Sequence, residues 1–190
     1  MSGEEPDLVR AAARGDRAAF DRLAESYGPR LRRFVEMMGV LEAEDVVQDT
    51  LKEAVTSIAS FRGRSEFSTW LLGIALNRTR RWWRAHAAVP DAVAPEKLDR
   101  ADPAARDRSL SSGLVRKESA ERVAIALDSL PPILREAFVL KHVEGLDYRE
   151  IGELAGTSEG TARVRAHRAK LLLQSELGPA FETLLARARK

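Results

Sequence analysis

The chain has 190 residues, 44% of them hydrophobic and 32% charged, with a net charge of +2, so it can form one ordinary domain or two small ones and is not a disordered chain. It contains no cysteine, which excludes disulfides and thiolate metal sites and fits a reducing compartment. Residues 1–7 lack the apolar stretch of a signal peptide, and no segment approaches the roughly 18 apolar residues of a membrane span, so we expect a cytoplasmic protein with no membrane partner.

The first half of the chain is predicted to be helical, because aromatics are few and alternating β-branched runs are almost absent. A short helix is expected over residues 8–13, followed by a second that Asp16 caps. Gly28-Pro29 is expected to interrupt or kink this second helix before it continues to Gly39.

A further helix should begin near Glu42, and a loop is expected over residues 60–65. From about Ser68 a long helix follows, whose C-terminal half is strongly basic. The apolar residues expected on the helix that begins near Glu42 are Val46, Leu51, Ala54, Val55 and Ile58.

Residues 87–118 contain three prolines and no sustained period, which predicts a flexible linker. One helix should then end before Pro131, and another should open at Pro131-Pro132 and close at Gly145. The expected fold is therefore all-α, with two small helical domains at 1–86 and 119–175. The tail at 176–190 is expected to pack back on the protein through Leu177, Phe181, Leu184 and Leu185.

Charge is segregated along the chain. Residues 1–60 carry 8 basic and 12 acidic side chains, whereas residues 61–86 carry 6 and 1. Residues 87–118 carry 6 basic and 6 acidic side chains, residues 119–157 carry 4 basic and 7 acidic ones, and residues 158–190 carry 7 basic and 3 acidic ones. Two acidic blocks, each followed by a basic one, favour two surfaces for a polyanion, with solvated helix faces as the alternative.

Residues 147–174 have the pattern of a helix-turn-helix. Asp147 and Glu150 form a start like a capping box, Gly156 supplies the turn, and Ser158 caps a second helix that runs to about Gln174. The two helices should cross closely at the small residues Gly152 and Ala155. The inward stripe of the second helix is predicted to be Ala162, Ala166, Ala169 and Leu173.

In a recognition helix the N-terminal residues meet base edges, and other basic residues hold phosphates. A solvated surface helix is the alternative, and a metal-binding role for His167 lacks a partner ligand at a suitable spacing. The base-reading candidates are Glu159, Arg163, Val164 and His167. The phosphate-binding candidates are Arg165, Arg168 and Lys170, and Ser158 and Thr161 complete the candidate DNA-binding set.

Residues 61–67 form a loop with two aromatics and two arginines, a combination that suits single-stranded nucleic acid, because rings stack on bases while guanidinium groups follow the backbone. Core packing is the alternative role for Phe67 and Trp70. The adjacent Trp82 and Trp83 do not both point inward. The candidates for this surface are Phe61, Arg62, Arg64, Phe67, Asn77, Arg78, Arg80, Arg81 and Arg84.

Several of these motifs, in this order, resemble a known family. Residues Ala43–Thr50, Phe61–Gly63, Phe67–Leu71 and Ile74–Asn77 are similar to region 2 of ECF-type (group 4) sigma factors of bacterial RNA polymerase. Similarity to region 4 of the same family is found at Leu130–Pro132, Glu136–Phe138, Glu144–Leu146, Tyr148–Gly152, Gly160-Thr161 and His167–Ala169.

The resemblance implies a subunit that joins core RNA polymerase and directs it to promoters without a cofactor, a metal or a catalytic residue. Asp45, Gln48 and Asp49 would dock on the polymerase clamp. The loop at 61–67 and the helix after it would capture an unstacked base of the −10 element, and the recognition helix would read the duplex −35 element. An anti-sigma partner is also implied.

The chain departs from the family pattern at Ala162, Arg163, Val164 and Ala166, which implies either a different −35 sequence or a region 4 that is less stable alone. It also departs at Leu51 and Val55, where aromatics are common, which implies altered clamp contacts or altered core packing. The alternative function is a stand-alone helix-turn-helix regulator, which has no need of the Asp45/Gln48 helix or of the aromatic-arginine loop. An enzyme is disfavoured, because the sequence has no Gly-rich phosphate loop, paired catalytic carboxylates or nucleophile–base set.

Overall fold

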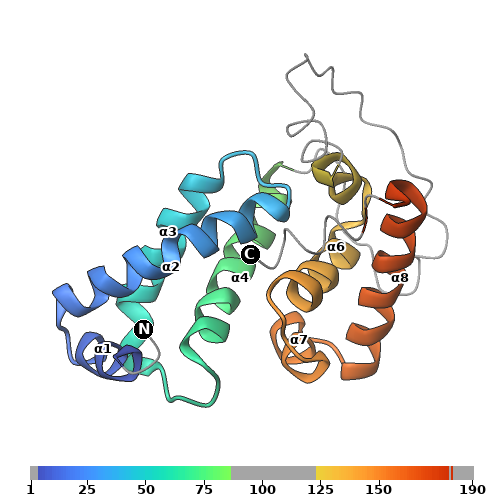
Figure 1. Ribbon diagram of the computed structural model, residues 1–190. Coiled ribbons are helices and arrows are strands. Elements are labelled where there is room, and N and C mark those ends of the chain that lie inside the picture. The colour runs from blue at the N-terminus through green and yellow to red at the C-terminus, as the bar shows by residue number, and fades with distance from the viewer. Residues whose placement is uncertain (1–3, 87–122, 180, 182–190) are drawn as a thin grey trace. The chain divides into compact units, whose positions relative to one another are not determined.

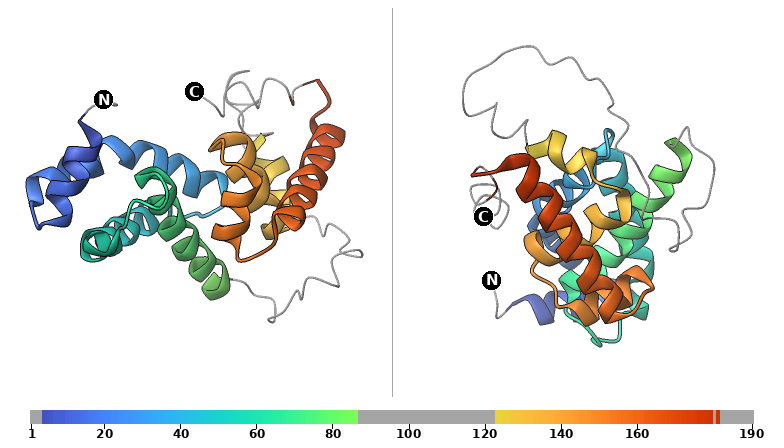
Figure 2. Two further views of the ribbon diagram at one scale, coloured as in Figure 1. Left: turned by 90° about the horizontal axis from the view of Figure 1, so that it is seen from below. Right: turned by 90° about the vertical axis from the view of Figure 1, so that its right-hand side faces the viewer.

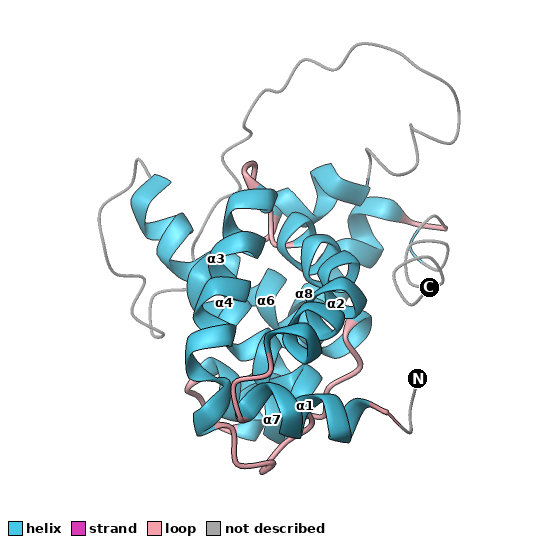
Figure 3. Cartoon of the chain, turned by 90° about the vertical axis from the view of Figure 1, so that its left-hand side faces the viewer, coloured by secondary structure: helices cyan, strands magenta, loops and turns pink. Residues whose placement is uncertain are grey.

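The computed structural model describes residues 4–86, 123–179 and 181, and these residues form helices, turns and loops with no strand (Figure 3). Residues 4–36 and 40–86 gather into one compact unit and residues 123–179 into a second (Figure 1). The predicted all-α fold is confirmed. The predicted linker at 87–118 lies outside the described residues, as do Leu184 and Leu185 of the tail. No helix in the described part of the chain is both long and apolar enough to cross a bilayer.

The N-terminal unit contains α1 (Glu5–Ala13), α2 (Arg17–Met37), α3 (Ala43–Ser57), the short 3₁₀ turn η1 (Ile58–Ser60) and α4 (Phe67–His86). The predicted cap is present, since Asp16 Oδ1 accepts a hydrogen bond from the backbone N–H of Ala19 at 3.1 Å. Residues 61–66 connect η1 and α4, so the loop predicted at 60–65 is present but begins one residue later, because Ser60 belongs to η1.

The predicted interruption of α2 is wrong, because the helix continues through Pro29. A proline inside a helix removes one backbone hydrogen bond and costs about 3 kcal/mol. Leu23, Leu31 and Phe34 are buried on α2 on both sides of the proline, and this tertiary packing holds the helix together across it.

The core of this unit comes from one face of each helix. Val55 was expected inside but is 44% exposed, because it lies two helical turns from Gln48 on the outer face of α3. The buried residues include Val9 and Ala12 of α1; Phe20, Leu23, Leu31, Phe34 and Val35 of α2; Val46, Val47 and Ala54 of α3; and Leu71, Leu72, Ala75 and Leu76 of α4.

The C-terminal unit contains a helical stretch at 123–129, α6 (Pro132–Phe138), a π-helical turn η3 (Val139–Val143), α7 (Tyr148–Ala155) and α8 (Glu159–Leu177). Helices α6 and α8 lie side by side within it (Figures 1 and 2). Phe181 of the tail is buried, with its ring centroid 6.3 Å from that of Phe138, so this part of the tail packs back on the unit as predicted.

The helix-turn-helix has the local geometry that the sequence predicts. Asp147 accepts a hydrogen bond from the backbone N–H of Glu150, whose carboxylate accepts one from the backbone N–H of Asp147, both at 2.8 Å. Gly156 ends α7 with φ +64°, a conformation that favours glycine. A Cβ at Gly152 would lie 2.9 Å from the carbonyl oxygen of Thr157, so only glycine allows this close approach.

Candidate nucleic-acid interface

Helix α8 has a buried face of small residues and an exposed basic face. Ala162, Ala166, Ala169 and Leu173 are fully buried, as predicted. The opposite face is therefore turned to solvent, and Val164 on it is 51% exposed. Of the predicted DNA-binding side chains on α8, Glu159, Arg163, Val164, His167 and Arg168 are exposed, while Thr161, Arg165 and Lys170 are half-buried.

Arg163 has a fixed position on this face. Its guanidinium donates to Glu159 Oε1 at 2.5 Å and lies 5.2 Å from the centroid of the Tyr148 ring. The ammonium of Lys141 lies 4.7 Å from the same centroid, so the ring of Tyr148 interacts with two cations. The spacing of Glu159 and Arg163 is visible in the sequence as an i,i+4 pair, but the role of Tyr148 is not, because it depends on how α7 packs against α8.

Ser158 and Thr161 act as a cap at the start of α8. Ser158 Oγ accepts a hydrogen bond from the backbone N–H of Thr161 at 3.1 Å, and the two hydroxyls lie 2.9 Å apart. Their hydrogen-bonding capacity is thus partly used within the helix terminus. Their predicted contact with DNA stays a prediction.

The aromatic residues around the 61–67 loop form one cluster. Phe67 is only 4% exposed, and its ring centroid lies 5.4 Å from those of Tyr27 and Trp70 and 5.8 Å from that of Phe61. Phe61 and Trp70 are half-buried at the edge of the cluster, with centroids 5.4 Å apart. Burial, together with a hydrogen bond to Glu5 and the negative charge of this carboxylate, raises the pKa of Tyr27 above its usual range.

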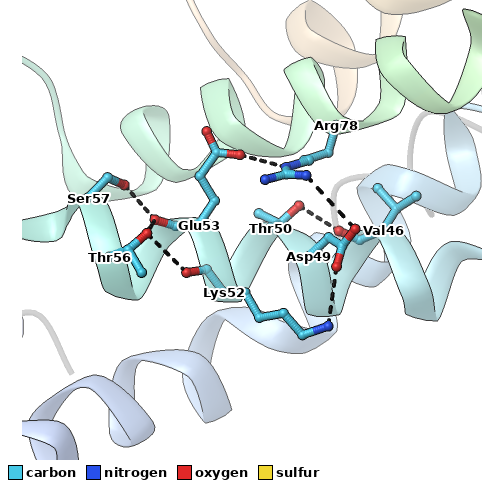
Figure 4. Close-up of polar contacts among 8 residues, drawn as sticks. All are labelled: Val46, Asp49, Thr50, Lys52, Glu53, Thr56, Ser57 and Arg78. Atoms are coloured by element: carbon cyan, nitrogen blue, oxygen red, sulfur yellow. Dashed lines mark hydrogen bonds and ion pairs between the residues drawn. The ribbon is translucent and has the colours of Figure 1, made fainter.

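The arginines of this region fall into two groups. Arg62 and Arg64 in the loop, and Arg81 and Arg84 on α4, are exposed and form no ion pair within the described residues. Arg78 instead points toward α3, where its Nε donates to Glu53 Oε2 at 2.6 Å and its Nη1 lies 3.9 Å from Asp49 Oδ2 (Figure 4). Of the other predicted residues on α4, Asn77 is exposed and Arg80 half-buried.

A second polar contact between α4 and the start of α3 lies near the end of α4. The indole N–H of Trp82 donates a hydrogen bond to Glu42 Oε2 at 2.9 Å. The ring of Trp82 also stacks on His86, with a centroid distance of 4.3 Å. The sequence did not reveal the partners of Arg78 or Trp82, because Glu53 and Glu42 lie 25 and 40 positions away along the chain.

The outer face of α3 contains the residues predicted to dock on polymerase. Asp45 and Gln48 are exposed and have no hydrogen bond or ion pair in the described part of the chain. Asp49 is also exposed but lies 3.3 Å from Lys52 Nζ as well as near Arg78. Val55 on this face is 44% exposed, and Leu41, just before the helix, is 65% exposed.

Comparison with known proteins agrees with the order of these surfaces. The model of "Sigma-70 region 2" matches residues 23–89, and that of "Sigma-70, region 4" matches residues 121–173. An ECF RNA polymerase sigma-E factor of Haemophilus influenzae is 32% identical over 181 residues, which are 90% of this chain and 94% of that protein. The chain belongs to the ECF sigma factors. Its function is thus the recognition of promoters in transcription initiation by RNA polymerase, and the alternative of a stand-alone regulator is not favoured.

Other relatives of this sigma factor extend over almost its whole length. The RNA polymerase sigma-H factor of Pseudomonas aeruginosa is 32% identical over 185 residues, 93% of this chain and 95% of that protein. A solved complex of CnrH with the cytosolic domain of CnrY matches 90% of this chain and 94% of that one, with a TM-score of 0.66 and 27% identity. The sigma factor RpoE, solved with the anti-sigma factor NepR from Bartonella quintana, matches 84% of this chain and 97% of its own, with a TM-score of 0.60 and 26% identity.

Sigma factors are not a class of enzyme. In the described ranges, no three His, Asp or Glu side chains gather in a group that could hold a metal ion. The chemistry that the site offers is that of recognition, through exposed guanidinium groups, aromatic rings at the edge of a cluster and one apolar side chain among cations.

The position of Phe67 at the centre of the aromatic cluster predicts unequal effects of two substitutions. Phe67→Ala should lower the free energy of unfolding of the N-terminal unit by about 3–5 kcal/mol, because it leaves a cavity among three rings. Phe61→Ala should cost roughly 1 kcal/mol, because that ring is half-exposed. Denaturant unfolding followed by the fluorescence of the tryptophans, Trp70 among them, measures both, and equal losses would contradict the central role of Phe67.

Proposed function

We propose that the sigma factor divides promoter recognition between two chemically different surfaces and docks on core polymerase with a third. The observation that carries this proposal is the contrast between the two basic surfaces. On α8 the exposed cations surround an apolar Val164 on a capped helix, whereas near α4 they flank an aromatic cluster. The first combination suits the major groove of duplex DNA, and the second suits unpaired bases.

On α8, the N-terminal residues read base edges of the −35 element. Glu159, Arg163, Val164 and His167 are all exposed, and the pairing of Arg163 with Glu159 and Tyr148 holds a long side chain in place before DNA arrives. Val164 supplies the apolar contact that suits a thymine methyl group. Arg165, Arg168 and Lys170 hold phosphates and fix the register of the helix, with Ser158 and Thr161 at its first turn.

The 61–67 loop and α4 take up the −10 element as a single strand. Phe61 is half-exposed at the edge of the cluster, so its ring is available for stacking on a base. The buried ring of Phe67 packs against it and supports the loop. Arg62 and Arg64 lie beside this ring in the chain, and Arg81 and Arg84 extend the cationic surface along α4. Unstacking a base costs a few kcal/mol, which binding at both DNA surfaces and to polymerase offsets.

The outer face of α3 docks on core RNA polymerase. Asp45 and Gln48 leave their polar groups available, and the exposed Val55 on the same face of α3 gives apolar surface of the kind that a protein interface needs. Exposed apolar residues among acids indicate a protein partner rather than DNA, because a DNA-facing surface would be cationic.

We further propose that the factor acts in the cytoplasm, has no catalytic step of its own, and is held inactive by an anti-sigma protein. The last point is supported by the similar solved structure of RpoE, which is bound to an anti-sigma factor. Residues 1–86 and 119–175 would be the two working domains, with 87–118 as the flexible linker between them and 176–190 as the tail.

Core polymerase reconstituted with the purified factor should start transcription from cognate promoters in a genomic promoter pool. A double variant, Asp45→Ala with Gln48→Ala, should weaken core binding about 10- to 100-fold, the loss expected when central polar contacts worth roughly 1–3 kcal/mol are removed. Glu25→Ala is the matched control, since Glu25 is an exposed acid of α2 without a partner in the described residues. If the wild-type factor neither binds core nor gives a run-off product, the proposed function fails.

Arg62→Ala with Arg64→Ala should impair strand opening. We expect reduced permanganate reactivity of thymines in the −10 element, while the closed complex still forms, because duplex binding depends on α8. Arg14→Ala, which removes an exposed arginine at the end of α1, serves as the control. Normal thymine reactivity in the double variant would contradict a role of the loop in opening.

Arg163→Ala and His167→Ala should change which −35 sequences the holoenzyme selects from a randomised library, with a loss of about 1–3 kcal/mol of discrimination at the base pair that each residue reads. Arg168→Ala is the contrast, since losing a phosphate contact should weaken all sites alike and lower the salt slope by about 0.9. Uniform weakening by Arg163→Ala would show that this residue only holds phosphate.

A further inference from the structure

Arg78 differs from Arg81 and Arg84 of α4 in its direction. Its side chain is 28% exposed and is directed at two carboxylates of α3, with Nε donating to Glu53 Oε2 at 2.6 Å and Nη1 3.9 Å from Asp49 Oδ2 (Figure 4). Because the side chain is largely buried and faces two carboxylates, its guanidinium is less available to a phosphate than that of an exposed arginine. The other exposed cations of α4, Arg81 and Arg84, have no such partner in the described residues.

The Arg78 pair is reinforced one helical turn further along α4. There the indole N–H of Trp82 donates to Glu42 Oε2 at 2.9 Å. Since Arg78 binds near the end of α3 and Trp82 binds just before its start, the two helices run antiparallel and are joined by polar contacts at two points. The hydrogen bonds are directional, whereas the apolar contact beneath them is not, so the ties fix how far α4 slides along α3.

These two helices have different partners in the proposed function, on which the following inference rests. The outer face of α3 docks on polymerase, and the exposed arginines of α4 meet the −10 strand. We propose that Arg78 is a positioning residue that holds α4 against α3, so that docking on polymerase presents the basic face of α4 to DNA in one fixed geometry. Asp49 then belongs to this internal network rather than to the docking face.

The alternative is that Arg78 contacts DNA directly, and salt dependence separates the two roles. Each phosphate contact on a single strand adds about 0.7 to the slope of log K against log salt. A residue that positions other contacts, and whose loss leaves them formed in a less favourable geometry, changes the affinity but not this slope. Glu53 separates the roles further, because a carboxylate adds nothing to the binding of a polyanion, and its removal weakens binding only through the tie.

The test uses holoenzyme and a promoter fork, that is, promoter DNA whose −10 element is present only as the single non-template strand. Arg78→Met keeps the aliphatic stem and removes the charge, and Glu53→Ala removes the partner. We expect each to weaken binding to the fork about five- to tenfold at constant slope, and the double variant to be no weaker than either single one, because contacting partners are not additive. Core binding and the circular dichroism spectrum should match those of the wild-type factor.

Two further variants complete the comparison. Arg81→Met, which removes an exposed cation, should lower the salt slope by about 0.7. Glu25→Ala, which removes an acid of α2 without a partner in the described residues, should change nothing. The Glu53→Ala variant keeps the test valid if Arg78→Met fails to fold.

Three results would overturn the positioning role. The first is normal fork binding by Glu53→Ala beside a weaker Arg78→Met with a reduced slope, which would make Arg78 a DNA contact. The second is normal binding by both variants. The third is a fold-loss of affinity for core polymerase equal to the fold-loss of affinity for the fork. The Arg78–Glu53 pair would then act only in folding or docking. A wild-type holoenzyme that does not bind the fork, or an unchanged slope for Arg81→Met, would instead count against the proposed function.

Discussion

Burial of a narrow, small-residue face is the constraint on which the rest of the structure depends. In α8 three alanines and Leu173 are completely covered, so the helix lies close to its neighbours and the large polar side chains lie outside this face. The same constraint acts on α3, where burial of Val46, Val47 and Ala54 leaves Asp45 and Gln48 outside. The functional surfaces are therefore the complement of the core.

Features set by local interactions could be predicted from the sequence. The capping box at Asp147, the left-handed turn at Gly156 and the alanine stripe of α8 depend on residues within a few positions of each other, and all three are present. The predictions that were wrong concern positions where tertiary packing outweighs a local signal. Pro29 does not break α2 because neighbouring apolar residues are buried on both sides of it, and Val55 lies on a face that only the packing of α3 and α4 defines.

The candidate site follows the same division. The exposure of the basic face of α8 could be read from its helical period, but the ring of Tyr148 beneath Arg163 could not. The charge segregation also needs revision, because acids of the N-terminal block are partly used inside the unit. Glu53 binds Arg78, Glu42 binds Trp82, and Glu44 pairs with Arg32 of α2. The acidic surface left for a partner is correspondingly smaller, and Asp45 is part of it.

The contact at Gly152 has a consequence for which parts of the helix-turn-helix can vary. The backbone of the turn after α7 lies so close to this residue that a side chain would not fit without moving the turn or the start of α8. The angle between the two helices is thus fixed by the main chain. The residues of α8 that depart from the family pattern therefore differ in kind. Arg163 and Val164 are exposed and bear on what the helix contacts, whereas Ala162 and Ala166 are fully buried and bear on its packing.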